Sequence, residues 1–194
     1  MNESELIISI QNGDSDSFRK LFDLYKDKAV RTAYHITGSQ AAAEDVAQEA
    51  FVKCYFEIGK LQNPECFKTW FYRLLVRTAW RYAAVEKKSV PVEEVFDQSR
   101  TSEEKSVEQQ YLETELTNTL YKQIQKLDKK RRTTVMLFYY SGLSTKEIAR
   151  VMGCMEGTVK SRLHSSRKIL KRNLENLQLK EGGYYGKAGY ESAL

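Results

Sequence analysis

The chain has 194 residues, 41% of them apolar, which is enough for one medium domain or two small helical ones. No run approaches the roughly 20 apolar residues of a membrane span, and the first residues lack the features of a secretory signal. Two histidines and three separated cysteines argue against a zinc module or a disulfide scaffold and favour a reducing cytoplasm. Ten glycines and two prolines favour helices over sheets with many turns. We therefore expect a cytoplasmic, all-α protein that does not insert into a membrane.

The net charge of +5 is unevenly distributed along the chain. Residues 128–172 carry 12 basic and 3 acidic groups, and residues 61–90 carry 6 and 2. The stretch between them, residues 91–127, carries 4 basic and 8 acidic groups. Solvated helix faces would explain one such basic patch, but two patches separated by an acidic segment indicate two anion-binding surfaces.

Four helices are predicted before residue 85. A short apolar helix over residues 4–12 ends at Gly13, and the second helix ends at Gly38. The apolar stripe of the second helix comprises Phe18, Leu21, Phe22, Tyr25, Ala29, Ala33 and Ile36. The stripe of the third comprises Ala43, Val46, Ala47, Ala50, Phe51, Cys54, Tyr55 and Ile58. The fourth helix is predicted to begin at Asn63-Pro64, with Asn as cap and Pro in the first turn.

A polar segment without helical periodicity, residues 86–106, is predicted to be a flexible linker. Helical spacing returns from Val107 and continues to Leu127, after which Asp128 can cap a further helix. The Gly- and Tyr-containing tail, residues 179–194, is predicted to be disordered.

Residues 144–172 have the pattern of a helix-turn-helix. Ser144 and Glu147 form a predicted capping box, and Gly153 suits the tight turn between the two helices. Ala149 is small enough for close packing of the helices, and Ile148 and Val159 would fill the angle between them. The second helix is rich in Lys and Arg and would fit the major groove of DNA. The alternative is an ordinary helical hairpin with a basic surface.

The fourth helix interleaves basic and aromatic residues. Arg73, Arg77 and Arg81 recur every four residues and therefore share one face. Aromatic rings beside such a cationic face suit single-stranded nucleic acid. Trp70 and Phe71 are more simply explained as core residues, whereas Trp80, among arginines, is harder to explain in that way.

An acidic face on the third helix is open to three interpretations. Glu44, Asp45 and Glu49 could form a metal-binding carboxylate cluster, which would make the chain a nuclease. They could instead be a docking surface for a basic partner helix. The residues alone favour a solvated helix face.

Taken together, the chain resembles the extracytoplasmic-function group of bacterial sigma-70-type sigma factors. The resemblance rests on EDVAQEAFVKCY (44–55), FKTWFYRLLVRTAWRY (67–82) and LSTKEIARVMGCMEGTVKSRLHSSRKIL (143–170). It implies an all-α protein of two helical domains: sigma region 2 over residues 1–85 and sigma region 4, with its helix-turn-helix, over residues 107–178.

The resemblance also implies three sets of contact residues. Core polymerase, at its β′ clamp helices, would be bound by Asp45, Gln48, Glu49, Phe51 and Tyr55. The −10 promoter element would be captured by Asn63, Phe67, Lys68, Trp70, Arg73, Arg77, Trp80, Arg81 and Tyr82. The −35 element would be bound by Gly157, Thr158, Lys160, Ser161, Arg162, His164, Ser165 and Arg167. Arg77 and Trp80, and His164 and Ser165, depart from residues frequent in the family, so the promoter sequences are not implied.

The expected function is that of a promoter-specificity subunit without catalytic activity, cofactor or metal. Its partners would be core RNA polymerase, through the β′ clamp helices and the β flap, promoter DNA, and an anti-sigma factor that is often membrane-anchored in this family. The main alternative is a stand-alone helix-turn-helix regulator that binds duplex DNA without polymerase.

Overall fold

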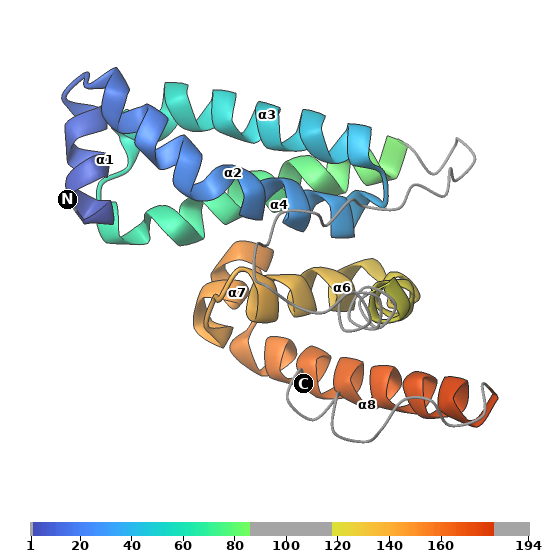
Figure 1. Cartoon of the computed structure of the whole chain (residues 1–194). Helices are drawn as coiled ribbons and strands as arrows, with labels where there is room; N and C mark the ends of the chain where they lie inside the picture. Colours follow the sequence, from blue (N-terminus) through green and yellow to red (C-terminus); the bar gives the residue numbers. More distant parts are fainter. Residues whose placement is uncertain (1, 86–117, 181–194) are drawn as a thin grey trace, which may run out of the picture.

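The computed structural model describes residues 2–85 and 118–180, and every regular element in these two ranges is helical (Figure 1). The named elements are α1 (Glu3–Gln11), α2 (Ser15–Thr37), α3 (Gln40–Glu57), η1 (Ile58–Lys60), η2 (Pro64–Cys66), α4 (Phe67–Val85), α6 (Lys129–Val135), η4 (Met136–Tyr140), α7 (Thr145–Met152) and α8 (Glu156–Lys180). Residues 118–125 form a further helix. The predicted linker (86–106), the predicted helical stretch 107–117 and tail residues 181–194 lie outside the described residues. Residues 179 and 180, predicted as the start of a disordered tail, instead form the end of α8. Within those ranges, no helix combines the length and apolarity that a bilayer crossing requires.

The N-terminal half, α1 to α4, is a helical bundle in which α2, α3 and α4 pack against one another and α1 closes one end (Figure 1). Local polar signals set its helix ends. The Asp14 carboxylate accepts a hydrogen bond from the Asp16 backbone N–H at 3.0 Å, and Ser39 Oγ accepts one from Ala42. Gly38 ends α2 with a φ of +87°, as predicted.

Three details of the N-terminal half differ from the sequence-based expectation. Asn63 caps a short 3-10 turn, η2, and α4 itself begins only at Phe67. Phe22 and Tyr55 were predicted in buried stripes but are 38% and 52% exposed. Helical spacing identifies which side chains share a face. It does not reveal that side chains at the edge of that face are left uncovered by the neighbouring helix.

The C-terminal half, residues 118–180, contains the predicted helix-turn-helix in α7 and α8. The Ser144–Glu147 capping box is formed, and Gly153 ends α7 with a φ of +62°. Ile148 and Val159 are completely buried between the two helices. The prediction of this motif is confirmed in its caps, turn and packing.

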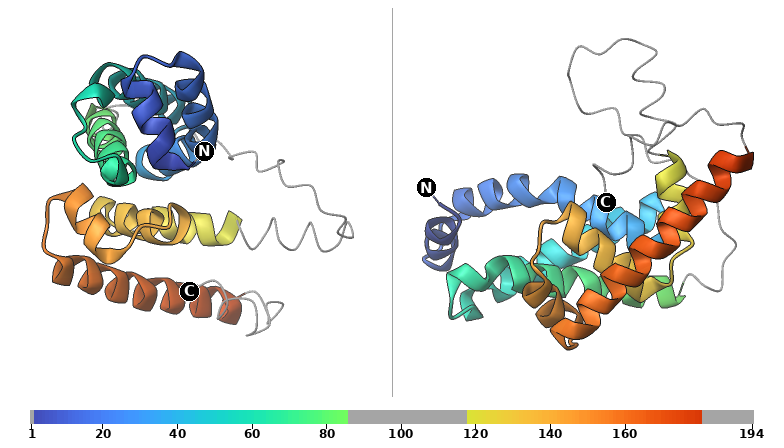
Figure 2. Two further views of the ribbon diagram at one scale, coloured as in Figure 1. Left: turned by 90° about the vertical axis from the view of Figure 1, so that its left-hand side faces the viewer. Right: turned by 90° about the horizontal axis from the view of Figure 1, so that it is seen from below.

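The two halves pack directly against each other, as Figure 2 shows from two directions. Helix α4 lies against α7, and α2 lies against α6 and η4. Leu137, Leu143 and Ile148 of the C-terminal half belong to the same buried cluster as Phe71 and Leu75 of α4. One apolar cluster therefore extends across both predicted helical domains, and the C-terminal half has a second cluster of its own around Met136 and Leu170.

His35 lies where the two halves meet. Its ring packs beside that of Tyr121, with ring centroids 5.2 Å apart, and its Nδ1 atom is buried and lacks a hydrogen-bond partner among the described residues. Burial, with the nearby positive charges of Arg132 and Arg31, lowers the pKa of His35 from 6.5 to about 4. This imidazole is neutral in the folded chain at neutral pH.

The turn of the helix-turn-helix gives a first testable prediction. Gly153→Ala is expected to lower the free energy of unfolding by about 1 kcal/mol, because an L-residue at positive φ is strained although the space there is open. Gly157→Ala is the matched control, because Gly157 lies in α8 with open space around it and without a positive φ. Urea unfolding of both variants tests this, and an equal effect of the two substitutions would contradict it.

His35 gives a second prediction. In the unfolded chain the His35 imidazole takes up a proton near pH 6.5, whereas in the folded chain it does so only near pH 4. The contribution of neutral His35 to the free energy of unfolding is therefore fully present above pH 6.5 and falls as the pH decreases toward 4. The loss should reach about 2 kcal/mol by pH 5. In His35→Gln, the difference in unfolding free energy between pH 7.5 and 5 should shrink by about this amount. An unchanged pH dependence would contradict the prediction.

Candidate functional site

Helix α8 presents a basic, solvent-exposed surface on the outer side of the C-terminal half. The Glu156 carboxylate accepts a hydrogen bond from Thr145 Oγ1 at 2.7 Å and ties the start of α8 to α7. The residues predicted to bind the −35 element fall into two groups. Gly157, Lys160, Ser161, His164 and Arg167 are exposed, while Thr158, Arg162 and Ser165 are partly buried. Exposed cations and polar groups on one helix can bind phosphates and base edges in a major groove.

Some of these side chains are held by neighbouring residues. The Arg167 Nε–H donates to the Tyr139 hydroxyl at 2.6 Å, and Arg131 Nε donates to Ser165 Oγ at 3.0 Å. Lys160 forms an ion pair with Glu156 at 2.9 Å. These contacts orient long side chains toward one face, which reduces the entropy they would lose on binding.

On α4 the residues predicted to bind the −10 element do not form one open surface. Asn63, Arg73, Arg77 and Arg81 are exposed, and Lys68, Trp70, Trp80 and Tyr82 are partly buried. Phe67 is completely buried and packs against Tyr25 and Phe71. In this conformation Phe67 supports the core and has no face to offer a base. Phe71, interpreted as core from the sequence, is also completely buried.

Three α4 side chains of this set already bind the C-terminal half. Lys68 Nζ donates to the Gly142 carbonyl at 3.0 Å. Arg73 donates through Nη2 and Nε to the Arg150 carbonyl at 2.7 and 3.2 Å. The Trp80 indole N–H donates to Thr133 Oγ1 at 3.1 Å. Arg73, the first of the three arginines predicted to share one cationic face, therefore already binds the C-terminal half.

The acidic surface of α3 consists of Asp45, Gln48 and Glu49, with Asp45 and Gln48 exposed. Glu49 binds Lys53 Nζ at 2.7 Å and also Arg81 of α4. These two cations hold the pKa of the Glu49 carboxyl below its usual range. In the described part of the chain, no three His, Cys, Asp or Glu side chains converge so that they could hold a metal ion.

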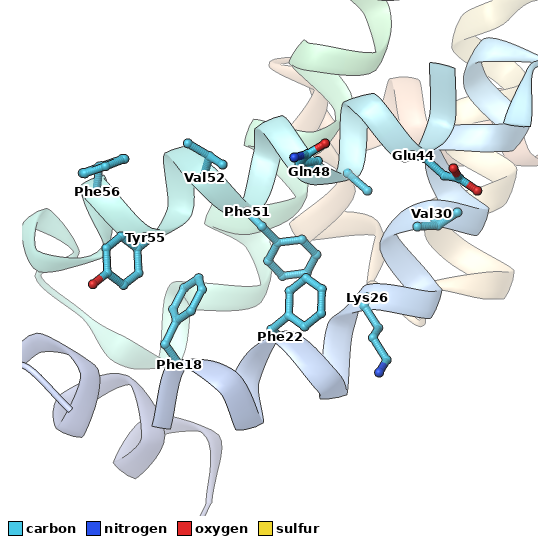
Figure 3. A pocket seen from close by; sticks show the side chains of 11 residues that line it. Phe18, Phe22, Lys26, Val30, Glu44, Gln48, Phe51, Val52, Tyr55 and Phe56 are labelled. Atoms are coloured by element: carbon cyan, nitrogen blue, oxygen red, sulfur yellow. The ribbon is translucent and has the colours of Figure 1, made fainter. Parts of the chain in front are cut away.

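Next to this surface, α2 and α3 border an open apolar groove of about 600 Å³ (Figure 3). Its aromatic lining comprises Phe18, Phe22, Phe51, Tyr55 and Phe56. Phe56 is 75% exposed and Val52 is 49% exposed. Phe51 and Tyr55, which the resemblance implied as polymerase contacts, both line this groove, but Phe51 is only 5% exposed whereas Tyr55 is 52% exposed. Phe18 and Phe22 were predicted as core residues, and Val52 and Phe56 were not predicted as contact residues. A sequence signal for these two residues was available. Val52 and Phe56 are four residues apart and therefore share one face of α3, and this apolar face lies outside the buried stripe.

Cys54 is the buried cysteine of the three. Burial raises the pKa of its thiol to about 12, so it stays protonated at neutral pH and packs as a small apolar group.

Comparison with known proteins agrees with this architecture. Residues 21–88 match the family model for sigma-70 region 2, and residues 117–170 match that for sigma-70 region 4. The chain is 33% identical over 181 residues to the ECF RNA polymerase sigma factor SigW of Bacillus subtilis, covering 88% of this chain and 96% of that protein. It is 31% identical to the RNA polymerase sigma-H factor of Pseudomonas aeruginosa over 183 residues, 90% of this chain and 95% of that protein.

Two solved structures share the fold. CnrH, solved in complex with the cytosolic domain of CnrY, is 19% identical with a TM-score of 0.67, covering 90% of this chain and 97% of that chain. RpoE of Bartonella quintana, solved with the anti-sigma factor NepR, is 20% identical with a TM-score of 0.65, covering 81% of this chain and 96% of that chain. The helix-turn-helix, the region 2 bundle and these matches together establish that the chain belongs to the sigma-70 family, as an extracytoplasmic-function RNA polymerase sigma factor that acts in transcription initiation.

Proposed function

We propose that this sigma factor uses three separate surfaces to bring core RNA polymerase to its promoters, and that it catalyses no reaction itself. The region 2 domain (residues 1–85) would carry the polymerase and −10 surfaces, and the region 4 domain (residues 107–178) the −35 surface. The observation that carries this proposal is the exposed basic face of α8 on a completely formed helix-turn-helix. We assign the protein to the cytoplasm, where core polymerase and promoter DNA are located.

The polymerase surface is α3 with the adjoining groove. Asp45 and Gln48 are exposed beside apolar side chains that are themselves exposed, such as Tyr55. An acidic rim along an apolar groove is complementary to an amphipathic helix with basic residues. We assign the β′ clamp helices of core polymerase to this surface.

The −10 surface is the exposed side of α4 with the preceding turn. Arg77 and Asn63 are exposed, and the Arg81 guanidinium stacks over the Tyr82 ring at 5.6 Å. Cations can follow the phosphates of a melted strand while aromatic rings stack on its bases, each stacked base contributing about 1–3 kcal/mol. Lys68, Arg73 and Trp80 would join this surface, together with the partly buried Trp70, once the contacts of the first three to the C-terminal half are released.

The −35 surface is the N-terminal half of α8. Lys160, Ser161 and His164 would face base edges, while Arg162 and Arg167 would lie nearer the phosphates. The same half of the chain would contact the β flap of the polymerase. A stand-alone DNA-binding regulator is not favoured, because the similarity to sigma factors covers region 2 as well as region 4.

An anti-sigma factor is the expected regulator. RpoE of Bartonella quintana was solved in complex with an anti-sigma factor, and this chain has the same fold. A regulator of this kind would act by covering the polymerase surface on α3 or the DNA surfaces on α4 and α8.

The polymerase surface gives a testable prediction. Asp45→Lys is expected to weaken binding to core polymerase at least about tenfold, because charge reversal at a complementary interface costs several kcal/mol. Glu175→Lys, the same change at an exposed position late in α8, should leave this affinity unchanged. Fluorescence titration of labelled sigma factor with core polymerase measures both, and equal affinities of the two variants would contradict the assignment.

The −35 surface gives a further testable prediction. His164→Ala in the holoenzyme should reduce discrimination between −35 sequences by about 1–3 kcal/mol at one base pair. Arg167→Ala should instead weaken binding to all promoters and reduce the slope of log affinity against log salt by about 1. Binding of a set of promoters with single changes, at several salt concentrations, separates the two effects. The assignment fails if neither variant alters promoter binding.

A further inference from the structure

Helix α1 contacts the turn between α3 and α4, residues 58–66, which leads into the proposed −10 surface. Figure 1 shows α1 at the end of the bundle where this turn lies, and α1 packs against both η1 and η2. The turn includes Asn63, which is exposed and belongs to the proposed −10 surface. Helix α1 precedes residues 21–88, the part of the chain that matches region 2, so its role has to be inferred from its contacts.

Gln11, the last residue of α1, is hydrogen-bonded to the backbone of this turn. Its Nε2 group donates to the Ile58 carbonyl at 3.0 Å and to the Leu61 carbonyl at 2.8 Å. Both bonds are partly buried, and they use both donors of the amide on the two ends of one 3-10 turn. A side chain that bridges two carbonyls in this way fixes the direction in which the chain leaves α3.

The Gln11 side chain starts from a well-fixed backbone. The N–H groups of residues 12–14, directly after it, donate to carbonyls of α1 at 2.9 to 3.1 Å. Ile7 and Ile10 are buried in the same apolar cluster as Ile58. Helix α1 is therefore held by the core and by its own C-terminal turn, so Gln11 can hold residues 58–61 in place.

The other end of the turn is connected to α1 through Tyr25. The Tyr25 hydroxyl donates to the Glu3 carboxylate in the first turn of α1. The Tyr25 ring packs edge-on against that of Phe67, the first residue of α4, with centroids 5.4 Å apart. Residues 58–66 are thus linked to α1 directly at their start and through Tyr25 at their end.

Between these two attachments the turn carries exposed polar side chains, namely Lys60, Gln62, Asn63 and Glu65. The Asn63 Oδ1 atom accepts a hydrogen bond from the Glu65 backbone N–H at 3.0 Å, which sets the orientation of the amide. The Nδ2 group of an amide carries two donors that can bind acceptors on the edge of an unpaired base. Such a contact is specific only when the turn that carries it is held in one conformation.

We propose that Gln11 is a positioning residue for the −10 element, because it holds residues 58–66 so that Asn63 contacts one base of the melted strand. The inference rests on the proposed −10 surface. Gln11 acts through the turn and does not itself contact the base. Without its two hydrogen bonds the turn samples more conformations, and the entropy lost when DNA orders it weakens binding at this base.

Binding of modified oligonucleotides to the holoenzyme tests the proposal. The probes carry the non-template −10 sequence of a promoter that the wild-type holoenzyme transcribes, each with one base replaced by an abasic site. One abasic position should weaken binding to the wild-type holoenzyme at least about fivefold. Asn63→Ser, which keeps a capping oxygen for η2, should reduce this penalty to less than about twofold.

Gln11→Met fills a similar space without a hydrogen-bond donor and should have the same effect as Asn63→Ser. It should weaken binding of the unmodified oligonucleotide at least about threefold and remove most of the penalty at the same position. Affinities for core polymerase and for a −35 duplex should not change. Gln11→Lys supplies N–H donors again and should restore most of the penalty.

Ser39→Ala is the matched control for a general loss of stability. It removes the capping hydrogen bond at the start of α3, at the opposite end of this helix from the turn, and should leave binding of every oligonucleotide unchanged. The proposal is overturned if Gln11→Met or Asn63→Ser keeps the wild-type penalty, or if Ser39→Ala loses it as well. A wild-type holoenzyme that does not bind the unmodified oligonucleotide would instead overturn the proposed −10 surface.

Discussion

Helix α4 has to satisfy two demands, and the rest of the structure follows from how it does so. Phe67, Phe71 and Leu75 are completely buried, so one face of α4 forms the centre of the region 2 bundle. The other face carries cations and partly apolar aromatic rings, which are costly to leave incompletely solvated. The carbonyls and hydroxyls of α6, α7 and the turn before α7 accept hydrogen bonds from three of these donors.

Local features of the fold were predictable from the sequence because their causes are local. Ser144 and Glu147 form their capping box from side chains three residues apart at a helix start, and Gly153 adopts the left-handed conformation that the turn requires. The internal packing of the helix-turn-helix follows from residues within one short segment, such as Ile148 and Val159. These parts of the helix-turn-helix could be placed before the structure was known.

Longer-range features could not be predicted in the same way. Helical spacing shows that Phe22 and Leu21 both lie toward an apolar side, but only the position of α3 decides that Leu21 is covered and Phe22 is exposed. Periodicity also cannot distinguish a residue that is buried by its own domain from one that is buried by the other domain. Leu143 is an example, because residues of the other half contribute to the cluster in which it is buried. Arg73 could be placed on a cationic face, but its acceptor is a backbone carbonyl 77 residues away.

The chemistry of the contact between the halves makes it suited to reversal. Its cationic donors bind backbone carbonyls, and phosphate oxygens can accept the same hydrogen bonds with the added attraction of full charge. The Glu49–Arg81 ion pair, which links the proposed polymerase and −10 surfaces, is partly exposed to solvent and therefore contributes little to stability. If the proposed −10 surface binds promoter DNA, exchange of these partners for phosphates would cost few net hydrogen bonds. The main opposing term would be the apolar area around Leu143 and Ile148, and the energy to expose it would have to come from the proposed binding of region 2 to polymerase and of region 4 to duplex DNA.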